Sequence, residues 1–173
     1  MRCKLVVEGK EFDIDILDPE LQKLLKPPKP PKRTGYERAN ECGTYFYSTS
    51  DGEVDDYSEI EGDETVQSDY DAANYYSDLT VAKNNIRADN LMRKLRRFAV
   101  EHRERELVWK PFSNKENYYI AYDYGENRLM VHVTGWAKGA FAIYFDYERT
   151  AQLAIDTFHD ELIWYFTEYK DSL

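Results

Sequence analysis

The sequence has few of the residues from which metal sites, disulfide frameworks and catalytic centres are built. Its 173 residues include two cysteines, Cys3 and Cys42, and three histidines, which form neither CxxC spacing nor an HExxH motif. The phosphate-binding and nucleophile motifs GxxxxGKS/T, GxGxxG and GxSxG are absent as well. We therefore expect a protein that is not an enzyme and that holds neither a metal nor a cofactor.

Long apolar runs and signal sequences are also missing. No stretch approaches the roughly 18 apolar residues of a membrane-spanning helix, and the first residues, MRCKLVVEGKEF, lack the apolar core of a signal peptide. Two cysteines that lie 39 positions apart favour a reducing compartment. We expect a soluble, cytoplasmic protein without a membrane partner.

Basic residues are absent from one long segment, between Arg38 and Lys83, which contains twelve acidic residues. Of the 33 acidic residues in the chain, the other 21 lie outside this segment, together with all 23 basic residues. The formal net charge of −10 thus belongs to this one segment, whose field repels nucleic acid and attracts basic surfaces. A hydrophobic content of 42% with 15% aromatic residues is typical of a folded chain, so we expect an acidic surface and not a free tail.

The N-terminal part of the chain, residues 1–26, predicts a small hairpin and a short helix. Residues 4–8 and 11–17 alternate in polarity around a Gly-Lys pair, which predicts two paired strands. A helix over 18–25 follows, opened by an Asp-Pro pair. Four prolines in the five positions from 27 onward predict an extended linker over 27–38.

The remainder of the chain contains two similar halves, over 39–110 and 111–173. Each half begins with an aromatic strand, a turn with glycine and a second strand, GTYFYSTSDGEVDDYSEI in the first and NYYIAYDYGENRLMVHVT in the second. An aromatic pair and a long helix follow in both. Tyr45 and Tyr118 are 73 positions apart, as are the two turn glycines. We interpret the halves as an internal duplication of a strand–strand–strand–helix unit.

Each of the two long helices carries one apolar stripe. In the second helix the stripe covers about five turns and consists of Ala151, Ile155, Phe158, Leu162, Phe166 and Tyr169. In the first helix it consists of Ile86, Leu91, Leu95, Phe98 and Ala99. Ser77 and Asp146 occupy the expected N-cap positions. Together with antiparallel strands, the stripes predict an α+β fold in which each helix is buried on its own sheet or on the other half.

The acidic stretch 51–71 predicts a return strand over 51–60 and a loop or irregular edge over 61–71. Acids along an exposed strand can protect a sheet edge from aggregation. They can also dock a basic partner, and carboxylates two residues apart repeat about every 6–7 Å, near the phosphate spacing of one DNA strand. In a partner-binding face the acids supply charge and the tyrosines rigid contact area. The candidate residues are Asp55, Asp56, Tyr57, Glu59, Glu61, Asp63, Glu64 and Tyr70.

The basic side of the first long helix is a second candidate surface. Its candidate residues for nucleic-acid binding are Arg93, Lys94, Arg96 and Arg97, which are suited to phosphates. The alternative is that this side pairs with the acidic segment of its own half, or of a second copy of the chain. We favour the pairing, because the acidic chain as a whole opposes nucleic acid at long range.

Several stretches that cover most of the chain carry a resemblance: LVVEGKEFDIDILDPELQKLLKPP, TGYER, NYYSD, NNIRADNLMRKLRRFAVEHRE, YYIAYDY, YFDYERTAQLAIDTF and DELIWYFTEY. In these stretches the chain resembles a family of short, mostly uncharacterised proteins encoded by phages, prophages and other mobile elements of Gram-positive bacteria. Small accessory genes of such elements often encode proteins that block or redirect host machinery, including defence systems. The resemblance therefore implies a bacterial host cell and a host protein as the partner, and it assigns no catalytic or binding residue.

Together these observations predict a non-enzymatic phage or mobile-element protein that occupies or inhibits a host protein with a basic surface. The expected partner is a nuclease or another defence factor, bound through the acidic, tyrosine-containing face. Two alternatives stay open: a nucleic-acid-associated accessory protein that uses the basic helix, and a protein that binds a small ligand or nucleotide on its aromatic sheet faces. A homodimer formed through the helix stripes is compatible with the pattern.

Overall fold

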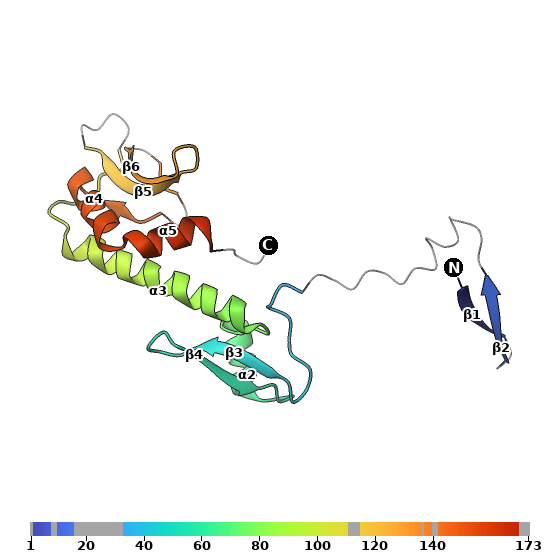
Figure 1. Cartoon of the computed structure of the whole chain (residues 1–173). Coiled ribbons are helices and arrows are strands. Elements are labelled where there is room, and N and C mark those ends of the chain that lie inside the picture. The colour runs from blue at the N-terminus through green and yellow to red at the C-terminus, as the bar shows by residue number, and fades with distance from the viewer. Residues whose placement is uncertain are drawn as a thin grey trace. The chain divides into compact units, whose positions relative to one another are not determined.

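The structure, a computed structural model, describes residues 2–7, 10–15, 33–110, 115–135, 137–139 and 142–169. The chain divides into two compact units, Met1–Arg33 and Thr34–Leu173, which we call the N-terminal unit and the main unit. Within the described residues there are four helices and three small sheets, in which all strand pairs are antiparallel (Figure 1). The predicted α+β class is confirmed.

In the N-terminal unit, strands β1 (Arg2–Val7) and β2 (Lys10–Asp15) pair in antiparallel fashion, with Val7 opposite Lys10. Strand β1 begins earlier than predicted, because the pairing extends to Arg2 opposite Asp15, and β2 begins one residue earlier, at Lys10, and ends at Asp15 instead of residue 17. The helix predicted over 18–25 and the proline-rich start of the linker lie outside the described residues. Residues 33–38 form neither helix nor strand.

The main unit begins with a hairpin of β3 (Thr44–Ser48) and β4 (Val54–Ser58), so the return strand lies inside the predicted range. The loop contains Gly52, whose φ of +85° is open to glycine and strained for other residues. Asn90 Nδ2 donates a hydrogen bond of 2.8 Å to the Gly52 carbonyl. The hairpin loop is therefore tied to the long helix of the same half.

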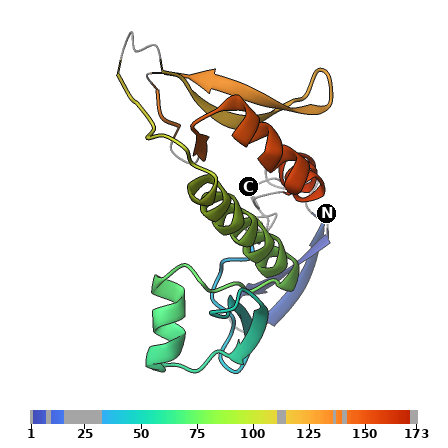
Figure 2. The same cartoon turned by 90° about the vertical axis from the view of Figure 1, so that its left-hand side faces the viewer.

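The loop predicted over 61–71 is wrong, because helix α2 (Glu64–Asp71) occupies most of this stretch. Asp63 caps the helix by accepting hydrogen bonds from the backbone N–H groups of Thr65, at 2.7 Å, and Val66, at 3.3 Å. Val66 is fully buried in a small aromatic core. One cap and one apolar anchor thus hold a helix of otherwise polar residues beside the β3–β4 hairpin (Figure 2).

A short third segment of strand leads into the long helix. Phe46 and Tyr76 exchange two backbone hydrogen bonds of 2.8 and 2.9 Å, on the side of β3 away from β4. Helix α3 (Leu79–Glu101) begins after Asp78, whose carboxylate accepts two hydrogen bonds from backbone N–H groups of the first turn. The predicted cap, Ser77, is wrong by one position, because its own backbone N–H is held by the Gly35 carbonyl outside the helix.

The second half of the main unit contains a three-stranded sheet, built from β5 (Asn117–Asp123), β6 (Arg128–Thr134) and β7 (Tyr144–Phe145) in the order β6-β5-β7. Both halves of the main unit therefore share one arrangement. The first strand of the hairpin pairs with the second strand on one side and, on the other, with a short segment that precedes the helix.

The single second helix predicted from the apolar stripe is wrong, because two helices occupy this stretch, α4 (Glu148–Thr157) and α5 (His159–Thr167). The break lies at Phe158, which has φ −116° and ψ 24°. The Phe158 ring packs edge-on against Phe98 of α3, with ring centroids 5.6 Å apart. The apolar stripe therefore packs against the core along both helices, and the helical backbone is interrupted at Phe158, whose ring is part of that stripe.

Asp146 does not cap α4, as predicted, since the N-cap is Tyr147 and no side chain bonds there. Asp146 is 1% exposed, and its Oδ2 accepts hydrogen bonds from the backbone N–H groups of Glu104, at 2.6 Å, and Arg105, at 3.1 Å. Burial raises the pKa of this carboxyl, but these hydrogen bonds outweigh it and lower the pKa below its ordinary value. Asp146 thus stabilises the segment that follows α3 through hydrogen bonds to its backbone.

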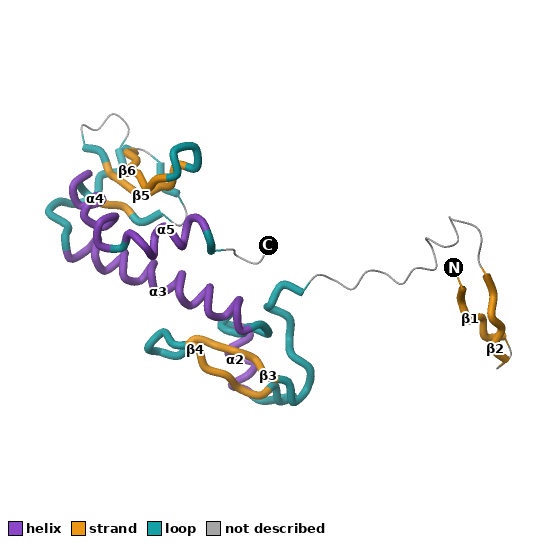
Figure 3. Tube along the Cα trace, in the orientation of Figure 1, coloured by secondary structure: helices purple, strands orange, loops and turns teal. Residues whose placement is uncertain are grey.

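Helix α3 contributes to both halves of the main unit. Its first part contacts β3 and β4, and its second part supplies Leu91, Leu95 and Phe98 to the main core, shared with Phe145 and with α4 and α5. Helices α4 and α5 lie between α3 and the β5–β6 sheet (Figure 3). The predicted halves 39–110 and 111–173 therefore lie in one compact unit.

Candidate protein-binding face

The acidic segment folds into an exposed surface over β4, the turn that follows and α2. We call the exposed residues among the predicted candidates the acidic face, which consists of Asp55, Asp56, Tyr57, Glu61, Glu64 and Tyr70. The two tyrosines are each 41% exposed. Because successive side chains of a strand alternate, Asp55 and Tyr57 lie on one side of β4 and Asp56 on the other. The face thus wraps around an edge strand.

Glu59, predicted as part of this face, is a buried structural residue and therefore a correction. It is 5% exposed, its carboxylate accepts a hydrogen bond of 2.6 Å from the Tyr75 hydroxyl, and it pairs with Arg38 at 3.0 Å. Burial, followed by the hydrogen bond to Glu59, raises the pKa of Tyr75 to about 12. A row of carboxylates at phosphate spacing is therefore interrupted at Glu59, which is closed to a partner.

Asp63, another predicted member of the face, is half-buried and has a structural role, because it caps α2.

The ring of Tyr70 packs against two neighbouring side chains. The Arg38 guanidinium lies 4.6 Å from the centroid of the Tyr70 ring, and Tyr75 meets that ring edge-on at 5.4 Å. Arg38 therefore fixes both the buried Glu59 and the exposed Tyr70.

The four carboxylates of the acidic face make no ion pair with a basic side chain among the residues that the structure describes. The predicted pairing with the basic helix of the same half is not found there. Instead, Arg87 pairs with Glu161 at 2.9 Å and Arg97 pairs with Glu101 at 3.7 Å. Within the described residues, the charges of these four carboxylates are therefore not neutralised by an ion pair.

The basic candidates Arg93, Lys94, Arg96 and Arg97 are all exposed on α3. Arg93, Arg96 and Arg97 have the spacing of residues on one side of a helix. Arg93 and Arg96 form no ion pair within the described part of the chain. This side of α3 is therefore open to a phosphate-bearing partner.

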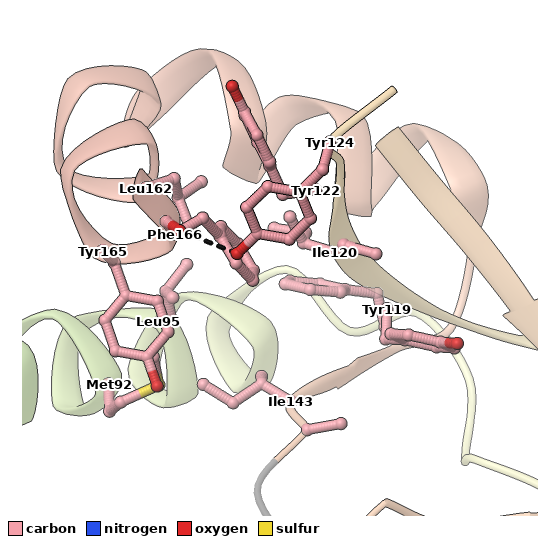
Figure 4. Close-up of a pocket in the computed structure, with 13 residues that line it drawn as sticks. Met92, Leu95, Tyr119, Ile120, Tyr122, Tyr124, Ile143, Leu162, Tyr165 and Phe166 are labelled. Atoms are coloured by element: carbon pink, nitrogen blue, oxygen red, sulfur yellow. Dashed lines mark hydrogen bonds between the residues drawn. The ribbon is translucent and has the colours of Figure 1, made fainter. Parts of the chain in front are cut away.

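An apolar pocket, which the sequence did not predict, lies between β5, α3, α5 and the segment just before β7 (Figure 4). Its volume is about 410 Å³. Met92, Ile120, Ile143 and Phe166 each line one of its walls. Because the walls come from segments far apart in the sequence, no local pattern points to them.

Among the described residues, no group of three His, Cys, Asp or Glu side chains is arranged to hold a metal ion. None of the described helices combines the length and the apolarity needed to cross a bilayer. Comparison with protein-family models, with curated proteins and with solved structures gives no match. Function is therefore inferred from the acidic face, the basic side of α3 and the pocket.

Proposed function

We propose that this is a non-enzymatic phage or mobile-element protein that binds a host protein through the acidic face and thereby blocks or redirects it. The class of partner is a protein with a basic surface, such as a nuclease or another defence factor. The observation that carries the proposal is a set of four exposed carboxylates without an ion pair among the described residues. An uncompensated field of this sign speeds and orients the approach of a basic surface.

The acidic face is also supported by hydrogen bonds and an ion pair within the fold. Asp63 fixes the start of α2, and Glu59, Arg38 and Tyr75 form a bonded network beneath the exposed side chains. A surface that is already ordered loses less conformational entropy on binding. Its two exposed tyrosines add contact area that has few rotatable bonds.

We infer further that the two halves of the main unit derive from a duplication, and their comparison supports a role for the acids. Both hairpins pair with a third segment in the same order. Strand β6 is an edge strand like β4, yet its sequence, RLMVHVT, contains no acid. If the halves are related, the same fold contains an edge strand without acidic residues. This weakens the alternative explanation that the acidic residues of β4 serve to prevent aggregation at a sheet edge.

The test compares two variants that change the charge of the chain by the same amount. One is D55K/D56K/E61K/E64K, on the acidic face. The matched control is E148K/D156K/D160K/E168K, which alters exposed acids of the α4–α5 region. Both sets carry a helix-dipole cost, because Glu64 lies in the first turn of α2, and Glu148 and Asp160 lie in the first turns of α4 and α5.

Tagged wild type and both variants are incubated with a nuclease-treated lysate of a Gram-positive host, and the bound proteins are eluted with stepped salt and identified by mass spectrometry. The enriched protein is then purified and its affinity measured by calorimetry. We expect one host protein that the wild type and the control retain and the face variant loses, with affinity about 100-fold lower, since each charge contributes up to about 1 kcal/mol. Retention by the face variant, or equal loss in both variants, contradicts the proposal.

A nucleic-acid-associated accessory role is the second candidate, favoured by the exposed arginines on one side of α3. It predicts binding to single- or double-stranded oligonucleotides that weakens steeply with salt. The variant R93E/R96E would abolish that binding, while the four-fold acid variant would strengthen it. Fluorescence anisotropy with labelled oligonucleotides separates this role from the first.

A further inference from the structure

The three-stranded sheet is incomplete along one edge. Among the described residues, β7 pairs with β5 at Tyr118 and Tyr119 only. Ala142 and Ile143, which precede β7, line the pocket instead of continuing the ladder. The edge of β5 from Ile120 onward therefore borders a wedge whose other walls are α3 and α5 (Figure 4).

The walls of this wedge are apolar and aromatic. Met92 and Leu95 come from α3, and Leu162 and Phe166 from α5. Among the described residues that form the lining there is no Asp, Glu, Lys, Arg or His. An ion buried here would lose its hydration without gaining a partner of opposite charge, so the site selects against charged ligands.

The pocket is braced by contacts between its own walls. Tyr122 of β5 stacks on Phe166 of α5, with ring centroids 6.0 Å apart and planes 15° from parallel. The Tyr124 hydroxyl donates a hydrogen bond of 2.8 Å to the Phe166 carbonyl (Figure 4). Contacts within the protein thus join the sheet and α5 at the pocket.

We propose that this pocket is a binding site for an uncharged, mostly aromatic small molecule. An apolar cavity of about 150 Å³ suffices for benzene, so the volume of about 410 Å³ suits a molecule of about two or three rings. An added peptide strand fits this edge poorly, because Ala142 and Ile143 line the pocket through which it would have to reach β5. The site is independent of the acidic face.

The chemical class is tested with two fluorescent probes that share one three-ring skeleton. N-phenyl-1-naphthylamine is uncharged, and 1-anilinonaphthalene-8-sulfonate carries an added sulfonate. Titrations at high salt screen the net charge of −10, so that long-range repulsion does not decide the result. We expect the uncharged probe to bind at least about tenfold more tightly. Equal binding of both probes, or no binding of the uncharged one, overturns the proposal.

The location is tested with the uncharged probe and two variants. Ala142→Trp places an indole in the pocket and should weaken binding about tenfold or more. Val133→Trp, at a position of β6 that is 51% exposed and outside the lining, is the control and should bind as the wild type does. If Ala142→Trp binds the probe as tightly as the wild type, the pocket is not the site.

A measurement on the wild type keeps the location testable if Ala142→Trp fails to fold. The chain has three methionines, of which Met92 lines the pocket and Met130, on β6, does not. With methyl-labelled methionine, the probe should shift the NMR signal of Met92 and leave that of Met130 in place. An unmoved Met92 signal at saturating probe overturns the assignment.

Discussion

Tyr45 and Tyr75 stack face to face in the small aromatic core, with ring centroids 4.3 Å apart and planes 10° from parallel. Each hydroxyl reaches a carboxylate of the acidic segment: Tyr45 donates to Asp69 at 2.8 Å, and Tyr75 donates to Glu59 at 2.6 Å. Two kinds of acidic residue can therefore be distinguished in this segment by whether they are bonded to the stacked tyrosines. Some are bonded to the core and hold the fold, and the others remain exposed on the acidic face.

Replacement of Tyr75 by Phe should destabilise the main unit. The lost hydroxyl donates to Glu59 and accepts a hydrogen bond of 2.7 Å from the Ala39 backbone N–H. Two polar groups would be left without this partner, so we expect the free energy of unfolding to fall by about 1–3 kcal/mol. Urea denaturation measures the change. Tyr57→Phe, at an exposed ring, is the control and should stay within about 0.5 kcal/mol of the wild type; equal loss in both variants would refute the bonded-core account.

Asp63→Ala should loosen α2 and with it part of the acidic face. Loss of the N-cap costs a helix about 1 kcal/mol. Hydrogen exchange of the Thr65 and Val66 amides, which Asp63 holds, should become faster. Asp71→Ala removes the same charge from the last turn of α2, where an acid opposes the helix dipole, and should not speed exchange. Unchanged exchange in Asp63→Ala would show that burial of Val66 alone fixes α2.

The two hairpins of the main unit could be predicted because their signals are local. Strands β3, β5 and β6 are rich in aromatic or β-branched residues, β4 contains Val54 and Tyr57, and glycine or turn residues separate the strands of each pair. Helix α2 could not be predicted in the same way, since Val66 is its one buried residue and supplies no periodic stripe. The helix break at Phe158 could not be predicted either, because the helical spacing of apolar residues continues through Phe158 without interruption.

The acidic face was predicted in part. Its exposed members follow from charge density alone, which the sequence displays directly. Glu59 was misplaced because its partners, Tyr75 and Arg38, lie 16 and 21 positions away and meet it only in the fold. The pocket was missed altogether, because it exists where Ala142 and Ile143 leave the edge of β5. Neither the composition nor the spacing of residues in the sequence indicates that Ala142 and Ile143 do not pair with β5.

Gly52→Ala should cost more stability than Gly62→Ala, although both glycines have positive φ, of +85° and +78°. The left-handed conformation penalises either alanine by about 1–2 kcal/mol. At position 52 the added Cβ would also lie 2.5 Å from the Asn90 side-chain oxygen, whereas position 62 has open space. We expect an additional loss of about 1 kcal/mol from the displaced Asn90 hydrogen bond. Thermal denaturation of the two variants in an Asn90→Ala background should remove the difference; a difference that persists would point to strain in the loop itself.

Asp146→Asn should make the stability of the main unit less dependent on pH in the acidic range. Backbone hydrogen bonds from Glu104 and Arg105 lower the pKa of Asp146 below its ordinary value of 3.8, against the effect of burial. The ionised carboxylate therefore stabilises the fold at pH above that value, and the contribution is lost as the pH falls through the lower folded pKa.

At neutral pH we expect Asp146→Asn to be less stable than the wild type by about 2 kcal/mol, because a neutral amide accepts the two hydrogen bonds more weakly than a carboxylate. The gap should narrow as the pH falls below about 4, where Asp146 of the unfolded wild-type chain becomes protonated, and the narrowing should be complete once the pH has fallen through the lower folded pKa. Asp156→Asn is the control, since this exposed carboxylate accepts a hydrogen bond from the Gln152 side chain on the same helix. Urea denaturation at a series of pH values measures all three proteins. A gap that stays constant into strong acid would mean that Asp146 acts through its shape and not through its charge.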